Sequence, residues 1–240
     1  MGAVGAEVFV SYGIRSLRAA MAVVILALQW PLYAQVLRTK KDAEGIYLKW
    51  AMASDPTTVG GSFGQILKSA ERSGGIALVS GCDNPVSPLT VPPRWSLAGA
   101  LDLLTAVYPK NDWTISDGVV NVLPRQGRPA VLEIQMAHFE WNTADLVSLS
   151  VDRLFQSNNI RQYLAAHRME SGLGQGTGLF PAPRVVKGKP APKQDGRGYQ
   201  MENATVLSTL NAIVGSYGNA VWSYEQRTCD GHGVYYISAR

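Results

Sequence analysis

Apolar residues recur every three or four positions in two segments of the first half of the chain, which is the spacing of an amphipathic helix. The first segment begins at Ser62, and Gly74 and Gly75 end it. The second segment begins at Ser96, a residue suited to cap a helix, and stops before Pro109. The apolar faces of the two predicted helices are Phe63, Ile66, Leu67 and Ala70, and Leu97, Ala100, Leu101, Leu104 and Val107.

Strands are predicted around these helices. IALVS (76–80) is a short apolar run after the first helix, and LTVPP (89–93) begins as a strand that ends at its prolines. After the second helix, DWTIS and VVNVL flank an Asp-Gly pair, the strongest short signal of a β-hairpin. A further strand is expected within 46–52. The pattern predicts an α+β fold, a small βαββαββ-type module with two helices packed on one face of a small sheet.

The second half predicts a similar order of elements with longer parts. It begins with a strand over 130–141, followed by a helical region over 144–169 in which Asn158 and Asn159 favour a break. Residues 170–198 are rich in Gly, Pro and basic side chains without periodicity, which is typical of an insertion. The remaining predicted elements are a strand (199–203), a helix (204–218) and a closing hairpin around RTCDGHG (227–233).

Two parts of the chain align when one is shifted by 109 positions, so that Ser96 meets Thr205. The other matched pairs are Leu97 and Val206, Leu101 and Leu210, Leu104 and Ile213, Tyr108 and Tyr217, Trp113 and Trp222, and Ile115 and Tyr224. Duplication would give two related modules in tandem, 35–123 and 130–240, joined by the linker PRQGRP at 124–129. The alternative is chance, because an amphipathic helix followed by an aromatic strand is a common pattern.

The first 34 residues have the layout of a secretory signal peptide. Arg15 and Arg18 precede an uncharged apolar run over 19–30, and Ala34 is the best cleavage position. The run is short for a membrane-spanning helix, which needs about 20 apolar residues. We therefore expect export to the periplasm or full secretion. The alternative is an uncleaved segment that tethers the chain to the membrane, the one case in which a membrane contact is expected.

Export would place the two cysteines of the chain in an oxidising compartment. Cys82 lies in the loop SGCDNPVSP, and Cys229 in the turn RTCDGHG. In an oxidising compartment two cysteines most simply form one disulfide, so Cys82 and Cys229 are the candidate pair. Two unpaired thiols, or pairing with another chain, are the alternatives.

The composition and the motifs give no sign of catalysis. The chain has 240 residues, 46% of them hydrophobic, and a net charge of +4 that calls for no nucleic-acid partner. His138, His167 and His232 lie in separate predicted elements without metal-ligand spacing. GLGQGTG (172–178) lacks the glycine spacing of a dinucleotide site. We therefore expect no metal, cofactor or catalytic residue. The alternative is an exported enzyme or enzyme inhibitor that uses the loop over 171–198.

Residues 61–123 resemble the secretin and TonB short N-terminal (STN) domain. The resemblance rests on FGQILKSAERSGGIALV, on LTVPPRWSLAGALDLLTAVY and on the hairpin WTISDGVVNVLP, and it is partial near 199–239. The shared features are the spacing of the apolar residues, a glycine and the Asp-Gly turn, and no catalytic motif is among them. The resemblance implies a non-catalytic interaction or adaptor module of the bacterial cell envelope, with an envelope or periplasmic protein as its partner. The sequence leaves the oligomeric state open.

Overall fold

A six-stranded sheet runs through the described part of the chain, which in this computed structural model comprises residues 43, 45–53, 59–82, 89–172 and 196–240. Three strands come from the first half and three from the second. In spatial order they are β4 (Asn111–Ser116), β5 (Val119–Pro124), β2 (Gly74–Ser80), β9 (Val221–Cys229), β10 (His232–Ala239) and β7 (Met169–Ser171). The two halves thus share one sheet, and β2 joins them by running parallel to β9 over the pairs from Gly74 with Val221 to Ser80 with Arg227.

Helices and one small two-stranded sheet complete each half. The helices are α2 (Val59–Ser69), α3 (Leu97–Val107), α4 (Val147–Phe155), α5 (Asn158–Ala166) and α6 (Val206–Tyr217), with a 3₁₀ helix, η1, over Ala130–Glu133. The small antiparallel sheets pair β1 (Met52–Ala53) with β3 (Thr90–Val91), and β6 (Gln135–Asn142) with β8 (Gly198–Thr205). The predicted α+β fold class is confirmed.

The two halves repeat one pattern of strand pairing. In the first repeat, β1 to β5, the strand before α2 pairs with the strand before α3, and the hairpin β4–β5 pairs through β5 with β2 in parallel. In the second repeat, β6 to β10, the strand before α4 pairs with the strand before α6, and the hairpin β9–β10 pairs through β10 with β7 in parallel. The helix α2 corresponds to α4 and α5 together. Duplication as the origin of this likeness stays a prediction.

The shift of 109 positions also holds for side-chain contacts. Ser96 caps α3 by accepting a hydrogen bond from the Gly99 amide at 3.1 Å, and Thr205 caps α6 through the Ser208 amide at 3.1 Å. Each repeat then ties its helix to its hairpin through a buried indole, and the partners again lie 109 positions apart. The indole N–H of Trp113 donates to Asp102 Oδ1 at 2.9 Å, and that of Trp222 donates to Asn211 Oδ1 at 3.0 Å.

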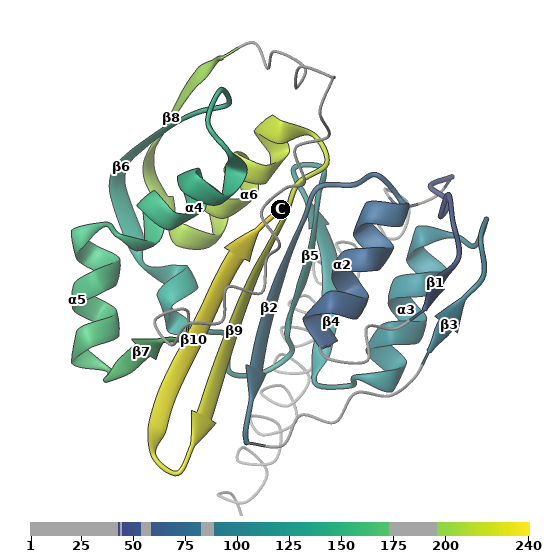
Figure 1. The fold of residues 1–240 in the computed structure, drawn as a ribbon, viewed down its shortest axis with the longest axis horizontal. Coiled ribbons are helices and arrows are strands. Elements are labelled where there is room, and N and C mark those ends of the chain that lie inside the picture. The colour runs from purple at the N-terminus through teal and green to yellow at the C-terminus, as the bar shows by residue number, and fades with distance from the viewer. Residues whose placement is uncertain (1–42, 44, 54–58, 83–88, 173–195) are drawn as a thin grey trace, which may run out of the picture. The chain divides into compact units, whose positions relative to one another are not determined.

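The helices of the two repeats cover opposite faces of the shared sheet. Along β2, Ile76 and Leu78 belong to the apolar cluster beneath α2 and α3, whereas Ala77 belongs to the cluster beneath α4, α5 and α6. This alternation follows from the two-residue period of a strand. Figure 1 shows α2 and α3 on one side of the sheet and α4 and α6 on the other, with β1–β3 and β6–β8 outside the helices.

Two local predictions are corrected. Gly74 and Gly75 do not end the first helix but begin β2, because α2 ends at Ser69. A Cβ atom on Gly75 would lie 2.1 Å from the Trp222 ring, so glycine permits this close approach between the repeats. The strand predicted over 130–141 begins only at Gln135, after the 3₁₀ helix η1.

Candidate functional site: a groove between the two repeats

A groove of about 310 Å³ lies where the first repeat meets the second. One wall is the outer hairpin β4–β5, and the other is α6, which packs over β2, β5 and β9 on the same face of the sheet. Thr114 and Ser116 of the hairpin stay exposed at the groove. The lining residues are Thr114, Ser116, Asp117, Val119, Asn121, Leu123 and Arg128 on one side, and Met201, Leu207, Ser208, Asn211, Ala212 and Gly215 on the other.

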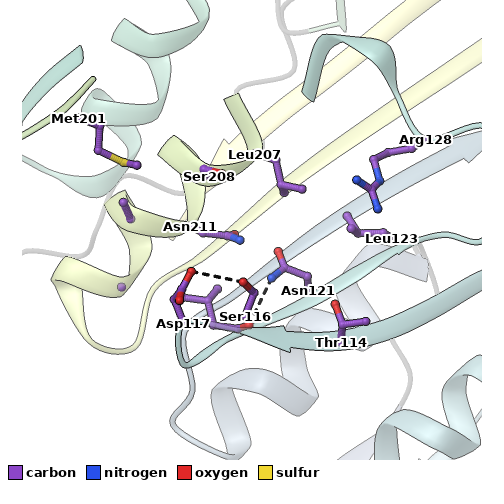
Figure 2. Close-up of a pocket in the computed structure, with 13 residues that line it drawn as sticks. Thr114, Ser116, Asp117, Asn121, Leu123, Arg128, Met201, Leu207, Ser208 and Asn211 are labelled. Atoms are coloured by element: carbon purple, nitrogen blue, oxygen red, sulfur yellow. Dashed lines mark hydrogen bonds between the residues drawn. The ribbon is translucent and has the colours of Figure 1, made fainter. Parts of the chain in front are cut away.

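Asn121 is the buried polar residue of this groove, with 2% of its surface exposed. Its Nδ2 donates a hydrogen bond to the Val119 carbonyl at 3.2 Å. Its Oδ1 finds no hydrogen-bond partner among the described residues. Figure 2 shows this oxygen pointing into the groove, between Asn211 and Leu123. Because a buried, unpaired polar group costs about 1–3 kcal/mol, the position favours a ligand that donates a hydrogen bond.

The repeat gives an internal comparison for this position. Trp113 pairs with Val122 and Trp222 with Ala239, and one residue further along, Thr114 pairs with Asn121 and Ser223 with Ser238. Asn121 of the first repeat therefore corresponds to Ser238 of the second. The hydroxyl of Ser238 has a partner within its own hairpin, Ser223 Oγ at 2.8 Å. The asparagine is a specific feature of the groove and not a requirement of the hairpin.

The walls of the groove are held in place by hydrogen bonds. Asn211 Oδ1 accepts from the Trp222 indole, which fixes the orientation of the Asn211 amide on α6. Asp117 lies at one end of the groove, where it accepts a hydrogen bond from Ser116 Oγ at 3.3 Å. Arg128 lies at the other end (Figure 2). Its side chain pairs with Glu133 at 2.7 Å. The groove thus combines an apolar lining with amide groups and with opposite charges at its ends.

The structure brings the predicted cysteine pair together. Ser80 of β2 lies beside Arg227 of β9, and Cys82 and Cys229 each follow two residues later along these parallel strands. Both are free thiols, and they contact one another. The pKa of the Cys229 thiol is raised to about 11, first by a hydrogen bond to Cys82 and to a smaller extent by partial burial. The disulfide itself stays a prediction.

Other predicted features lie apart from the groove or outside the described residues. His138 is exposed and pairs with Glu140 and Glu202 on β6 and β8, whereas His167 and His232 are exposed at a helix end and at a turn. The signal segment 1–34, with its cleavage position Ala34, lies outside the described residues, as does most of the insertion at 170–198. Among the described residues, no group of three His, Cys, Asp or Glu side chains could hold a metal ion.

Sequence reasoning did not identify the groove, although one signal was present. Asn121 is the polar residue in the otherwise apolar run VVNVL, and a buried polar residue needs a partner. The Asp102 side chain is exposed on α3, and it accepts the hydrogen bond of the Trp113 indole.

No protein-family model, no curated protein and no solved structure matches this chain. None of the helices in the described ranges is long and apolar enough to span a membrane.

Proposed function

We propose that this chain is an exported, non-catalytic protein–protein interaction module, an adaptor of the bacterial cell envelope, whose groove takes a segment of a partner polypeptide. The observation that carries the proposal is the unpaired Asn121 Oδ1 at the buried floor of an open groove. An acceptor in this position stabilises the folded chain only when a donor reaches it, and a peptide N–H is such a donor.

The size and the charges of the groove suit a polypeptide segment. A volume of about 310 Å³ is at the lower end of the range for ligand sites and accommodates one or two side chains. Leu123 and Leu207 offer apolar contact in the middle of the groove, and Asp117 and Arg128 offer opposite charges at its ends. A segment with an apolar side chain, a free backbone N–H and charged flanks matches each of these features.

A second surface supports a protein partner. Tyr47, Trp50 and Trp95 are exposed by 58%, 49% and 37%, although such side chains are usually covered. Tyr47 and Trp95 lie on neighbouring backbone segments, because Tyr47 bridges to Ser96 and the Leu48 amide donates to the Trp95 carbonyl at 2.9 Å. Exposed Trp and Tyr are enriched at protein interfaces. The resemblance of residues 61–123 to the STN domain adds the expectation that the partner belongs to the envelope.

Site-specific photocross-linking tests the groove as a partner site. A benzoyl-phenylalanine in place of Ser208, which is exposed and lines the groove, should give one discrete adduct in exporting cells after irradiation. The matched control is the same residue in place of Ala106, which is exposed on α3 across the sheet. Adding Asn121→Val removes the acceptor and should reduce the Ser208 adduct at least fivefold in a folded protein.

The proposal fails if the adduct forms equally from the Ala106 position, or if Asn121→Val leaves the Ser208 adduct unchanged. Circular dichroism and a thermal melt of the Asn121→Val variant separate a lost contact from a lost fold. Because the variant removes a buried unpaired oxygen, its melting temperature should be the same as that of the parent chain or higher.

A further inference from the structure

The strand β4 lies at one edge of the six-stranded sheet, where within the described residues it pairs with β5 alone. The Val120 amide of β5 donates to the Ser73 carbonyl at 3.1 Å, on the side away from β4. Ile115 lies opposite Val120, and in such an antiparallel pair both residues direct their N–H and C=O groups away from one another. The N–H and C=O of Ile115 therefore point out from the edge of the sheet. By the two-residue period of a strand, those of Trp113 and Asn111 do the same.

The chain itself caps half of these outward groups. The Asn111 carbonyl accepts a hydrogen bond from Arg125 Nε at 3.1 Å, and the Asn111 amide is bonded within the preceding turn. The Trp113 amide donates to Asp112 Oδ1 at 2.9 Å. In the part of the chain that the structure describes, the Trp113 C=O and both groups of Ile115 have no such partner. The edge is thus closed at the start of β4 and open at its end.

The turn after β4 adds one more outward group. Ser116 pairs with Val119 across the two-residue Asp-Gly turn, so the Ser116 carbonyl points to β5. A trans peptide directs the N–H that follows, which belongs to Asp117, the opposite way. The open groups of the edge are therefore the Trp113 C=O, the Ile115 N–H and C=O, and the Asp117 N–H.

We propose that two copies of this protein pair through their β4 strands, which run antiparallel about a two-fold axis with Ile115 of each copy opposite Ile115 of the other. The two sheets then continue into one another. The contact is isologous, because the same edge is used on both sides, and it closes at a dimer. The proposal goes beyond the adaptor function and does not rest on it, since it concerns a sheet edge and a second copy of the chain.

The capped groups select this register. The two Ile115 residues exchange N–H and C=O hydrogen bonds, and the Trp113 C=O of each copy accepts from the Asp117 N–H of the other. These bonds use every open group and leave Asp112 and Arg125 in place. A register shifted by one residue on each strand, with Trp113 opposite Ile115, would need the Trp113 N–H. Asp112 already holds that donor.

The side chains agree with this register. Thr114 lies opposite Ser116 of the second copy, and both are exposed hydroxyl residues, a pair that can hydrogen-bond across strands. Asp112 lies opposite Gly118, so no two charged side chains face one another directly. Ile115 is half-buried at the rim of the apolar cluster beneath α2 and α3. Contact between the two Ile115 side chains would remove more apolar surface from water.

The short open stretch fits a second copy better than a long strand of another protein. A long strand would continue past Trp113 and meet groups that Asp112 and Arg125 already occupy. The β4 strand of another copy ends at its own turn, so the capped groups of both copies lie beyond the contact. The interface is small, and we therefore expect association that increases with protein concentration and not a permanent dimer.

Paired charges at the two exposed hydroxyl positions test the contact in solution. The sedimentation coefficient of the exported chain should increase with concentration. Thr114→Lys with Ser116→Lys sets like charges opposite one another and should abolish this increase. The matched control, Thr114→Lys with Ser116→Glu, sets opposite charges there and should keep it. Because both variants change the same exposed residues, circular dichroism should show the same fold in both.

Disulfide trapping reads the register. In a Cys82→Ser, Cys229→Ser background, Thr114→Cys and Ser116→Cys are prepared as separate chains and mixed in a glutathione redox buffer. Next to the hydrogen-bonded Ile115 pair, the Cα atoms of opposite residues are about 4.5 Å apart, which a disulfide can span. The mixture should give about fivefold more covalent dimer than either single variant alone, because residue 114 is not opposite itself.

Three outcomes would overturn the proposal. If Thr114→Cys alone gives the most covalent dimer, the copies pair in the shifted register. If the lysine pair and the lysine–glutamate pair sediment alike, association does not use this edge. A sedimentation coefficient of the unsubstituted chain that does not change with concentration would show that the copies do not associate. The Ser208 adduct is measured without these substitutions, so failure of the adaptor proposal and failure of this one can be told apart.

Discussion

The thiol of Cys229 lies beside the thiol of Cys82 just beyond the last paired residues of β2 and β9. The hydrogen bond to Cys82 favours the protonated form of Cys229, and the pKa of Cys229 is therefore raised to about 11, compared with about 8.5 for an ordinary thiol. Because the thiolate is the nucleophile, a raised pKa makes Cys229 less reactive at neutral pH.

This shift predicts how alkylation of Cys229 depends on pH. In the reduced protein, the rate of reaction with iodoacetamide should increase about tenfold for each pH unit above pH 8 and level off near pH 11. The midpoint of the profile is the decisive quantity, since the absolute rate also depends on access. In Cys82→Ala the hydrogen bond is gone, so the midpoint should move down. Peptide mass spectrometry after timed quenching measures both profiles, and a midpoint near 8.5 in the parent chain would contradict the contact.

Among the elements, the repeated contact between helix and hairpin is the best-defined unit of the fold. Trp113 donates to Asp102 and Trp222 to Asn211 with nearly the same geometry, so a carboxylate and an amide oxygen perform the same task in the two repeats. Both indoles are buried, at 6% and 0% exposure, and an indole N–H without an acceptor would be costly there.

Because Asp102 and Asn211 hold equivalent positions, two substitutions of Asp102 can be compared with one another. Asp102→Asn copies the second repeat and keeps an acceptor for the Trp113 indole, so the free energy of unfolding should change by less than about 0.5 kcal/mol. Asp102→Ala removes the acceptor and should lower it by about 1–2 kcal/mol. Urea denaturation followed by tryptophan fluorescence measures the difference. Equal losses in the two variants would show that the acceptor atom does not matter.

Elements defined by local signals could be predicted from the sequence. Short stretches of residues specify the helix caps Ser96 and Thr205. They also specify the Asp-Gly turns of both hairpins, where Asp117 and Asp230 have positive φ. The break between α4 and α5 was also predicted from local asparagines. The 3₁₀ helix at Ala130–Glu133 was not, although Val131 and Leu132 are both buried, which a strand with one covered face does not allow.

The arrangement of the elements could not be predicted, because it depends on pairs far apart in the sequence. The pairing of β2 with β9 joins strands separated by more than half of the chain. Nothing local to either strand specifies it. The groove follows from that pairing, since it exists only because α6 crosses to the first repeat. The sequence could identify Asn121 as a polar residue in an apolar run, but not the surface to which it belongs.

For the whole molecule, the junction of β2 and β9 decides whether the two repeats behave as one cooperative unit. Cys82 and Cys229 lie at the end of this junction and are separated by most of the folded chain. A disulfide between them would close a long loop, which stabilises a protein mainly by restricting its unfolded state. Because the thiols already contact one another, the bond requires little rearrangement of the backbone.

Intact mass spectrometry of the exported protein tests the signal peptide and the disulfide together. If the chain is cut after Ala34, the mass should begin at Gln35. It should also be two hydrogens lighter than the reduced form and resist alkylation without a reductant. Reduction should then lower the free energy of unfolding by up to about 4–5 kcal/mol, the value that the loop-entropy model gives for so long a loop. The Cys82→Ser, Cys229→Ser variant should resemble the reduced form whether or not a reductant is present, which separates the bond from other effects of the reagent. A mass that retains residues 1–34, with both thiols alkylated, would contradict export. It would leave the β2–β9 pairing to hold the repeats together without a covalent link.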